Sequence, residues 1–353
     1  MSKSYNTQKV WGENVPRKEN RKYIGFYLFP NYWIGEDLNP LLEKYQTSGN
    51  DEILKEIKQK MRKEVISYKN SNHELILCGD GLILFRDYEI EEKIKDWEEK
   101  FNHDIMTPFS PVYEAWAEYI KISNIIYFSI DCASHYRINY YVYEFRELNR
   151  NDFLRITYRN GKLHRQTDYS RNSLYAVTRL DPSKDTFKHT AYNGLMSQLD
   201  IFNDMYNVFF KKIISDDEAI EFISALSKSL SEHNLKNYNI SLVLSWFLIE
   251  AHISELWKIF ISGCNSERRK KLTGRDYSVS VQIEMLELNK RIDTDQYKRL
   301  DFLRKIRNKI IHDNYKCSKS QSEEALTQAR EIAKKKFEID FPFNISGHST
   351  LGL

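Results

Sequence analysis

The stretch from Ile240 to Ile261 constrains the fold more strongly than any other part of this sequence. Large apolar side chains recur along it at the three- and four-residue spacing of an α-helix, namely Leu242, Trp246, Ile249, Ile253, Leu256, Trp257 and Phe260. The stretch is long enough to cross a membrane, but it also contains Glu250, His252, Glu255 and Lys258. A charged side chain at a bilayer centre costs about 3 kcal/mol. We therefore expect the core helix of a bundle and no membrane span.

Further helices are expected around this core helix. Apolar periodicity and cap residues predict them at about 196–213, 216–233, 279–291, 295–313 and 322–337. Asp216 is a suitable N-cap for the second of these helices. Short connections favour antiparallel neighbours, so this part of the chain is expected to form an all-helical, up-down bundle.

The N-terminal half has a different pattern, with aromatic and β-branched runs that are typical of strands. Strands are expected at 23–29 and 125–130, the second paired with 138–145. Asp80-Gly81 and Asn160-Gly161 predict hairpins that join 74–78 to 82–86 and 155–159 to 162–166. Helices are expected at 51–68, 89–101 and 112–122.

The chain as a whole is therefore predicted to be an α+β protein. We expect residues 1–190 to form a mixed, mostly antiparallel α+β domain, residues 191–345 a helical bundle, and residues 346–353 a tail. The polar stretch around Pro182 is the best boundary candidate.

Composition favours a cytoplasmic protein without a cofactor. The four cysteines lie far apart and lack metal-ligand spacing, so free thiols in a reducing compartment are expected. The N-terminus has no apolar leader, and no phosphate-binding glycine loop is present. The formal net charge is only +3, but basic residues are concentrated between Glu267 and Lys336.

The predicted helix at 295–313 carries the strongest functional signal. Leu303, Ile306 and Ile310 lie on one apolar face. Arg304, Asn308 and His312 recur at four-residue intervals on another face, with Arg307 at its edge. Such a stripe combines fixed cations, an amide and an imidazole that titrates near neutrality, which suits phosphodiester cleavage. The alternative is a solvated helix face whose cations favour the helix dipole.

The pair Arg307-Asn308, followed after three residues by His312, resembles the RNxxxH motif of HEPN-domain ribonucleases. The resemblance covers only the C-terminal bundle. It implies that Arg307, Asn308 and His312 are catalytic. It also suggests supporting roles for Arg304 and for Glu250 on the core helix; alternatively, Glu250 is an exposed residue on a polar flank.

The resemblance implies a metal-independent endoribonuclease in which the ribose 2′-hydroxyl attacks the adjacent phosphorus. The products are a 2′,3′-cyclic phosphate and a 5′-hydroxyl. HEPN enzymes of this kind act as homodimers and occur among phage-defence and toxin effectors, so a trigger or an antitoxin is an expected partner. The alternative is a non-catalytic HEPN module for dimerisation or nucleic-acid binding.

Two basic runs are candidates for RNA-backbone contacts. One comprises Arg268, Arg269, Lys270, Lys271 and Arg275, and the other is Lys334–Lys336. Either run could equally be a solvated loop or helix end.

Overall fold

The computed structural model describes residues 21–27, 38–61, 63–93, 111–137, 145–159, 162–165, 195–274 and 276–343. The chain divides into two compact units. The first comprises residues up to Ile130 together with Leu148–Asn207, and the second comprises Asp131–Glu147 together with residues from Val208 onward. The division falls inside helix α4 (Pro111–Arg137) rather than at the polar stretch around Pro182. The protein is α+β, as the sequence predicts.

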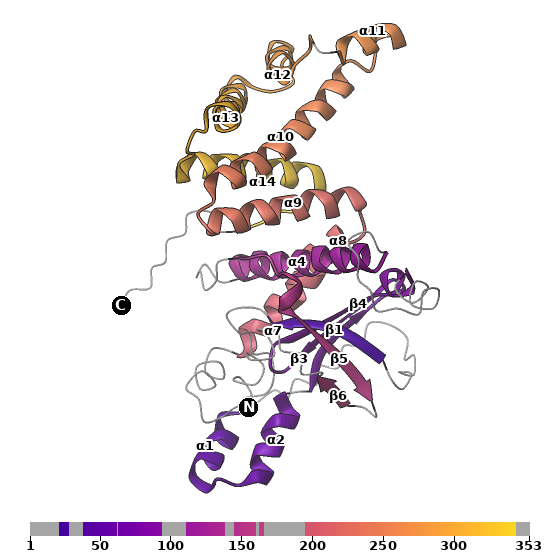
Figure 1. Cartoon of the computed structure of the whole chain (residues 1–353), viewed down its shortest axis with the longest axis vertical. Coiled ribbons are helices and arrows are strands. Elements are labelled where there is room, and N and C mark those ends of the chain that lie inside the picture. The colour runs from indigo at the N-terminus through magenta and orange to yellow at the C-terminus, as the bar shows by residue number, and fades with distance from the viewer. Residues whose placement is uncertain are drawn as a thin grey trace, which may run out of the picture. The chain divides into compact units, whose positions relative to one another are not determined.

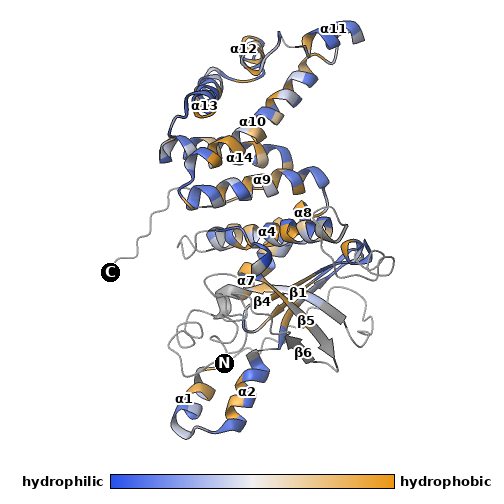
Figure 2. Ribbon diagram, viewed as in Figure 1, coloured by the Kyte–Doolittle hydropathy of each residue, from blue (hydrophilic) through white to orange (hydrophobic). Residues whose placement is uncertain are grey.

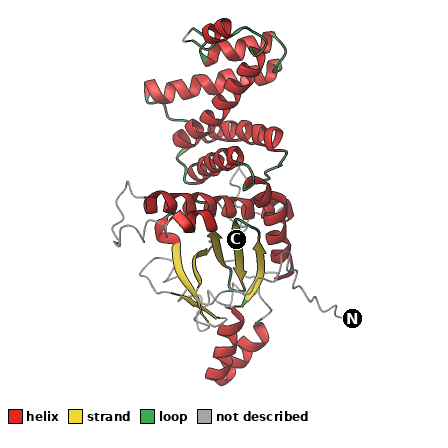
Figure 3. Cartoon of the chain, turned by 90° about the vertical axis from the view of Figure 1, so that its right-hand side faces the viewer, coloured by secondary structure: helices red, strands yellow, loops and turns green. Residues whose placement is uncertain are grey.

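The first unit is built on a six-stranded antiparallel sheet (Figures 1 and 3). The strand order is β2-β3-β4-β1-β5-β6. The strands are β1 (Arg21–Tyr27), β2 (Glu64–Lys69), β3 (His73–Cys78), β4 (Leu82–Asp87), β5 (Phe153–Arg159) and β6 (Lys162–Arg165). Both predicted hairpins, β3-β4 and β5-β6, are confirmed. Gly81, in the turn between β3 and β4, has a φ of 79°, a conformation that a residue without a Cβ adopts readily.

Helices accompany this sheet in the first unit. They are α1 (Asn39–Ser48), α2 (Asp51–Met61), the first part of α4, and α7 (Leu195–Asp204). Tyr119 of α4 packs edge-on against Phe85 of β4, with ring centroids 6.0 Å apart. Tyr68 of β2 stacks on Tyr206 just after α7, at 3.9 Å. These contacts fasten helices to the sheet.

Two predictions for the N-terminal half are wrong, namely the strand at 125–130 and the helical end of the segment 51–68. Residues 125–130 are helical and belong to α4, so they cannot form the expected third strand pair, and residues 138–144 lie outside the described part of the chain. Ile125, Ile126 and Phe128 are all fully buried. A short apolar run buried on every side has the same sequence pattern in a helix as in a strand.

The helix expected at 51–68 ends at Met61, and β2 follows it. Val65, Ile66 and Tyr68 of this strand are residue types that favour strands, and β2 pairs with β3. The helix expected at 89–101 is described only as far as residue 93, where 88–93 are helical.

The second unit is helical in its described residues. Its helices are α8 (Lys211–Ile213), α9 (Asp217–Asn234), α10 (Tyr238–Phe260), α11 (Ser266–Leu272), α12 (Val279–Leu288), α13 (Thr294–Asp313) and α14 (Lys319–Phe337), with the end of α4. A π-helical turn, Met205–Phe210, joins α7 to α8 within the predicted helix 196–213. The predicted helices are confirmed, whereas α11 was not expected.

Helix α10 lies at the core of this unit, packed against α9 and α14. Its Leu242, Trp246 and Ile249 are at most 1% exposed. By length and composition it is the one helix among the described residues that could cross a membrane, with 44% of its most apolar window buried. Its burial against two amphipathic helices matches the expected bundle-core role.

Small hydroxyl side chains line the contacts of α10 with its neighbours. Ser229 of α9 lies 2.7 Å from the Ser245 hydroxyl and donates to the Ser241 carbonyl at 2.8 Å. Ser322 of α14 donates to the Ser241 hydroxyl at 2.9 Å. All four serines are fully buried, so small, hydrogen-bonded residues allow the three helices to approach closely.

Candidate active site

Helix α13 carries the predicted site and is capped at both ends. The Asp293 carboxylate accepts a hydrogen bond from the backbone N–H of Gln296 at 2.7 Å. At the other end, Asn314 has a left-handed conformation with a φ of 50°, and its N–H bonds to the carbonyl of Lys309. The helix therefore stops one residue after His312, which places this imidazole in the last turn.

Buried leucine and isoleucine side chains fix the rotation of α13. Leu300, Leu303 and Ile306 are at most 6% exposed, whereas Ile310 is half-buried. With 100° of rotation per residue, this face leaves Asn308 and His312 on an outer stripe. Figure 2 shows the hydrophilic residues along much of α13. The predicted arrangement of faces is thus confirmed.

Arg307 lies at the border between the buried and the outer faces. It is half-buried, and its Nη1 donates to the side-chain oxygen of Asn308 at 3.0 Å. Its Nε is fully buried and makes no hydrogen bond. An unsatisfied buried donor costs about 1–3 kcal/mol, and because this Nε is buried, a bound acceptor would have to contact the other nitrogens of the guanidinium.

His312 is exposed, and the structure records no hydrogen bond or ion pair for it within the described residues. Asn308 is half-buried one turn before it. The imidazole is therefore accessible for proton exchange with a bound molecule.

Arg304 is less available than the sequence suggests. Its guanidinium bonds to the Asp301 carboxylate at 2.7 Å, and Lys305 binds the same carboxylate at 2.7 Å. Burial alone would raise the pKa of Asp301, but hydrogen bonds from Lys305 and Arg304 hold it below its ordinary value. Sequence reasoning missed Asp301, although its three-residue spacing from Arg304 is a recognisable ion-pair signal.

Glu250 is bound within its own helix. Its carboxylate accepts a hydrogen bond from the indole N–H of Trp246 at 2.7 Å. In the described residues, no hydrogen bond or ion pair joins Glu250 to α13. The structure thus explains how Glu250 orients a buried tryptophan, while its expected supporting role remains a prediction.

The two basic runs differ in how many of their side chains bind other residues of the protein. Arg268, Arg269, Lys270 and Lys271 are all exposed on α11, and only Arg269 has a recorded side-chain bond, to the Ser262 carbonyl at 3.0 Å. Arg275 lies outside the described residues.

In the second run, Lys334 pairs with Asp340, and Lys336 binds both Glu218 and Glu255. Acidic residues distant in sequence therefore neutralise part of this run, so α11 is the stronger candidate for backbone contacts.

No family model, curated protein or solved structure matches this chain. No group of three or more His, Cys, Asp or Glu residues suited to a metal ion occurs in the described part of the chain.

Proposed function

We propose that this protein is a metal-independent endoribonuclease of the HEPN type. The observation that supports this most directly is Arg307, a half-buried cation bonded to Asn308 and five residues before an exposed histidine. A phosphate oxygen is the kind of acceptor that a guanidinium donor fork binds best.

In the proposed reaction the ribose 2′-oxygen attacks the adjacent phosphorus as its proton passes to a base. The bond from phosphorus to the 5′-oxygen breaks, and an acid protonates the leaving oxygen. His312 fills one of these proton-transfer roles, because a histidine side chain serves as general acid or general base. Arg307 stabilises the charge on the phosphoryl oxygens, and Asn308 holds the guanidinium in place.

A single copy of His312 does not provide both a base and an acid on opposite sides of the scissile bond. We therefore propose a two-fold homodimer in which the α13 helices of two protomers form one cleft.

The biological setting proposed is phage defence or a toxin in the cytoplasm. The N-terminal α+β unit would restrain the nuclease or respond to a trigger, and a separate antitoxin is an alternative restraint. The second candidate function is a non-catalytic HEPN module that only dimerises and binds nucleic acid. The exposed cations of α11 support this second candidate, because contacts to an RNA backbone need no catalytic side chain.

Cleavage of RNA by the purified protein, with chelator present, tests the proposal. Wild type should produce cyclic-phosphate ends, and His312→Ala should produce none, with unchanged helix content. Lys298→Ala removes an exposed cation from the same helix and should leave cleavage intact.

Three results would count against the nuclease. They are equal activity of wild type and His312→Ala, loss of activity in chelator, and cleavage of DNA, which lacks the 2′-hydroxyl. Tight RNA binding without cleavage, by a dimer and under every trigger tried, would favour the binding module.

A further inference from the structure

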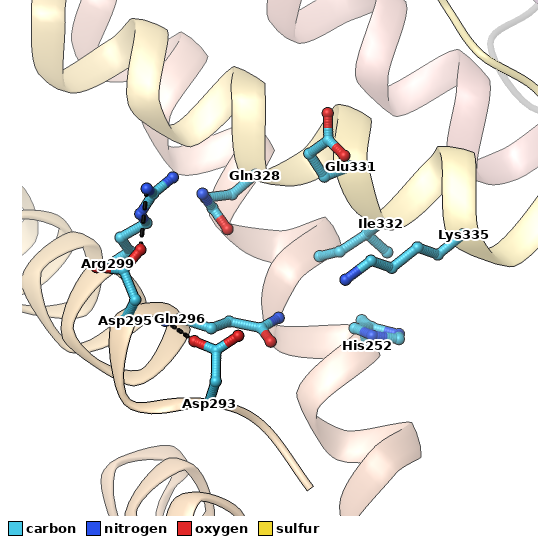
Figure 4. Close-up of a pocket in the computed structure, with 9 residues that line it drawn as sticks. All are labelled: His252, Asp293, Asp295, Gln296, Arg299, Gln328, Glu331, Ile332 and Lys335. Carbon is cyan, nitrogen blue, oxygen red and sulfur yellow. Dashed lines mark hydrogen bonds and ion pairs between the residues drawn. The ribbon is translucent and has the colours of Figure 1, made fainter.

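A cavity of about 200 Å³ lies in the second unit, where the first turn of α13 meets α10 and α14 (Figure 4). It is separate from His312, because Gln296 and His312 are sixteen residues apart and hence roughly 24 Å apart along the helix axis. Its lining is almost entirely polar, comprising His252, Asp293, Asp295, Gln296, Arg299, Gln328, Glu331, Ile332 and Lys335.

Several of these side chains direct unused hydrogen-bonding atoms into the cavity. Gln328 is only 8% exposed, and its amide nitrogen donates to Glu324 at 3.0 Å. Its amide oxygen therefore remains as an acceptor, directed toward the cavity in Figure 4. Asp293 uses one carboxylate oxygen to cap α13, which leaves the other oxygen as a second acceptor.

Donors complete the lining. Gln296 extends its amide across the cavity toward His252, and the ammonium of Lys335 points inward from α14 (Figure 4). The Nδ1 atom of His252 is buried and has no hydrogen bond. The same Nδ1 lies 3.8 Å from the Glu255 carboxylate, and burial lowers the pKa of His252.

The charges of the cavity disfavour an anionic ligand. Its three carboxylates outnumber the two cations, and Arg299 is already paired with Asp295 at 3.0 Å. Asp293 and Gln328 present acceptor oxygens to the cavity, which suits a neutral molecule with N–H donors, while Lys335 and Gln296 suit a carbonyl of the same molecule. A buried isoleucine, Ile332, can contact a planar face.

From this arrangement we propose that the cavity binds a guanine base. Among the RNA bases, guanine presents the largest set of N–H donors on one edge, at N1 and N2, beside the O6 carbonyl. Asp293 and Gln328 would accept from that edge, and Lys335 would donate to O6. Guanine binding by this cavity does not depend on the proposed function. The further assignment of the guanine to the RNA substrate, several nucleotides from the cleaved bond, rests on that function.

Calorimetric titration of the full-length His312→Ala variant tests the proposal without interference from cleavage. Guanosine should bind, and inosine, which lacks only the N2 amino group, should bind at least about tenfold more weakly, the factor for about 1.4 kcal/mol. Adenosine has a donor at N6 and an acceptor at N1, where guanosine has an acceptor at O6 and a donor at N1, so it should bind more weakly still.

Three variants locate the binding. Gln328→Leu removes the buried acceptor and should weaken guanosine at least about tenfold. Asp293→Asn retains an N-cap but replaces an acceptor oxygen with a donor, so it should abolish the preference over inosine even if Gln328→Leu does not fold. Gln59→Leu, at an exposed glutamine of α2, is the matched control and should bind like the parent.

Failure of every nucleoside to bind at millimolar concentration would overturn the proposal, as would equal binding of guanosine and inosine. Two further titrations distinguish a guanine within RNA from a free guanine nucleotide. A short single-stranded RNA with one guanine should bind more tightly than guanosine, whereas tighter binding of guanosine monophosphate than of that RNA would overturn the assignment to the substrate. Guanosine binding in a protein that cleaves no RNA would leave the cavity assignment standing and remove the nuclease.

Discussion

At the scale of single residues, the shape of the Arg307 guanidinium matters more than its charge. One donor nitrogen holds the Asn308 oxygen, and another is buried without a partner. Lysine would retain the charge but not this fork. If the proposed chemistry holds, Arg307→Lys should lower kcat about 10²-fold, nearly as much as Arg307→Ala.

Single-turnover cleavage measures this effect. Arg291→Lys is the matched control, because this arginine is exposed and lies outside α13 and the proposed site. A silent Arg307→Lys variant would mean that the residue contributes charge alone.

A second residue-scale prediction concerns Asp131 in α4. Burial raises the pKa of its carboxyl to about 8, whereas an unfolded aspartate titrates near 3.9. Between these values the folded state holds one extra proton, so Asp131 makes the free energy of unfolding fall as the pH rises, by at most about 1.4 kcal/mol per unit. Asp131→Asn should lose less stability than wild type between about pH 5 and pH 8.

Urea unfolding across that range measures the difference. His135 donates to the Asp131 carbonyl at 2.7 Å, and burial lowers its pKa, so its own contribution has the opposite sign and declines as the pH falls. Because the His135 Nδ1 lies 3.8 Å from the Asp131 carboxylate, the same comparison in a His135→Gln background separates the two contributions. Parallel curves for the two proteins would show that Asp131 is ionised in the fold.

The sequence predicted the candidate residues on α13 because helical spacing alone places them. It did not predict how they are paired. The bonds of Arg304 to Asp301 and of Lys336 to Glu218 and Glu255 depend on rotamers and on packing between helices. The cavity has no sequence signal either, since its lining comes from three helices distant in the chain.

At the scale of elements, the N-cap of α9 offers a direct test of local stability. The Asp216 carboxylate accepts hydrogen bonds from the N–H groups of Glu218 at 2.9 Å and Ala219 at 3.3 Å. Asp216→Ala should therefore lower the free energy of unfolding by about 1 kcal/mol. Asp216→Asn preserves the acceptor and should change it by far less. Chemical denaturation distinguishes the two, and equal losses would contradict the capping role.

Elements were predictable where sequence signals agreed with one another. A cap and apolar periodicity coincide in α9, and the ends of α9 and α13 were each predicted within one residue, whereas α14 begins three residues before its predicted start. They were not predictable where tertiary contacts decide the structure. Ile125 and its neighbours carry strand-like residues, yet they complete a buried helix.

At the scale of the whole molecule, the proposed homodimer makes activity depend on protein concentration. Specific activity should fall on dilution, and an excess of His312→Ala protein should suppress a fixed amount of wild type, because mixed dimers hold a single catalytic imidazole. Sedimentation should show dissociation over the same concentration range. The control is an equal excess of an unrelated protein, and activity that is independent of dilution and mixing would indicate a complete site in each protomer.

The serines between α9, α10 and α14 also affect how relatives of this chain can be identified. A side chain larger than serine at 229, 241, 245 or 322 would force helices apart, whereas large apolar residues elsewhere in the core can exchange with one another at modest cost. Divergence should therefore erase the leucines and isoleucines sooner than these four small positions. Distant relatives of this chain would then be recognised by these four small residues together with Arg307 and His312, even where overall sequence identity is low.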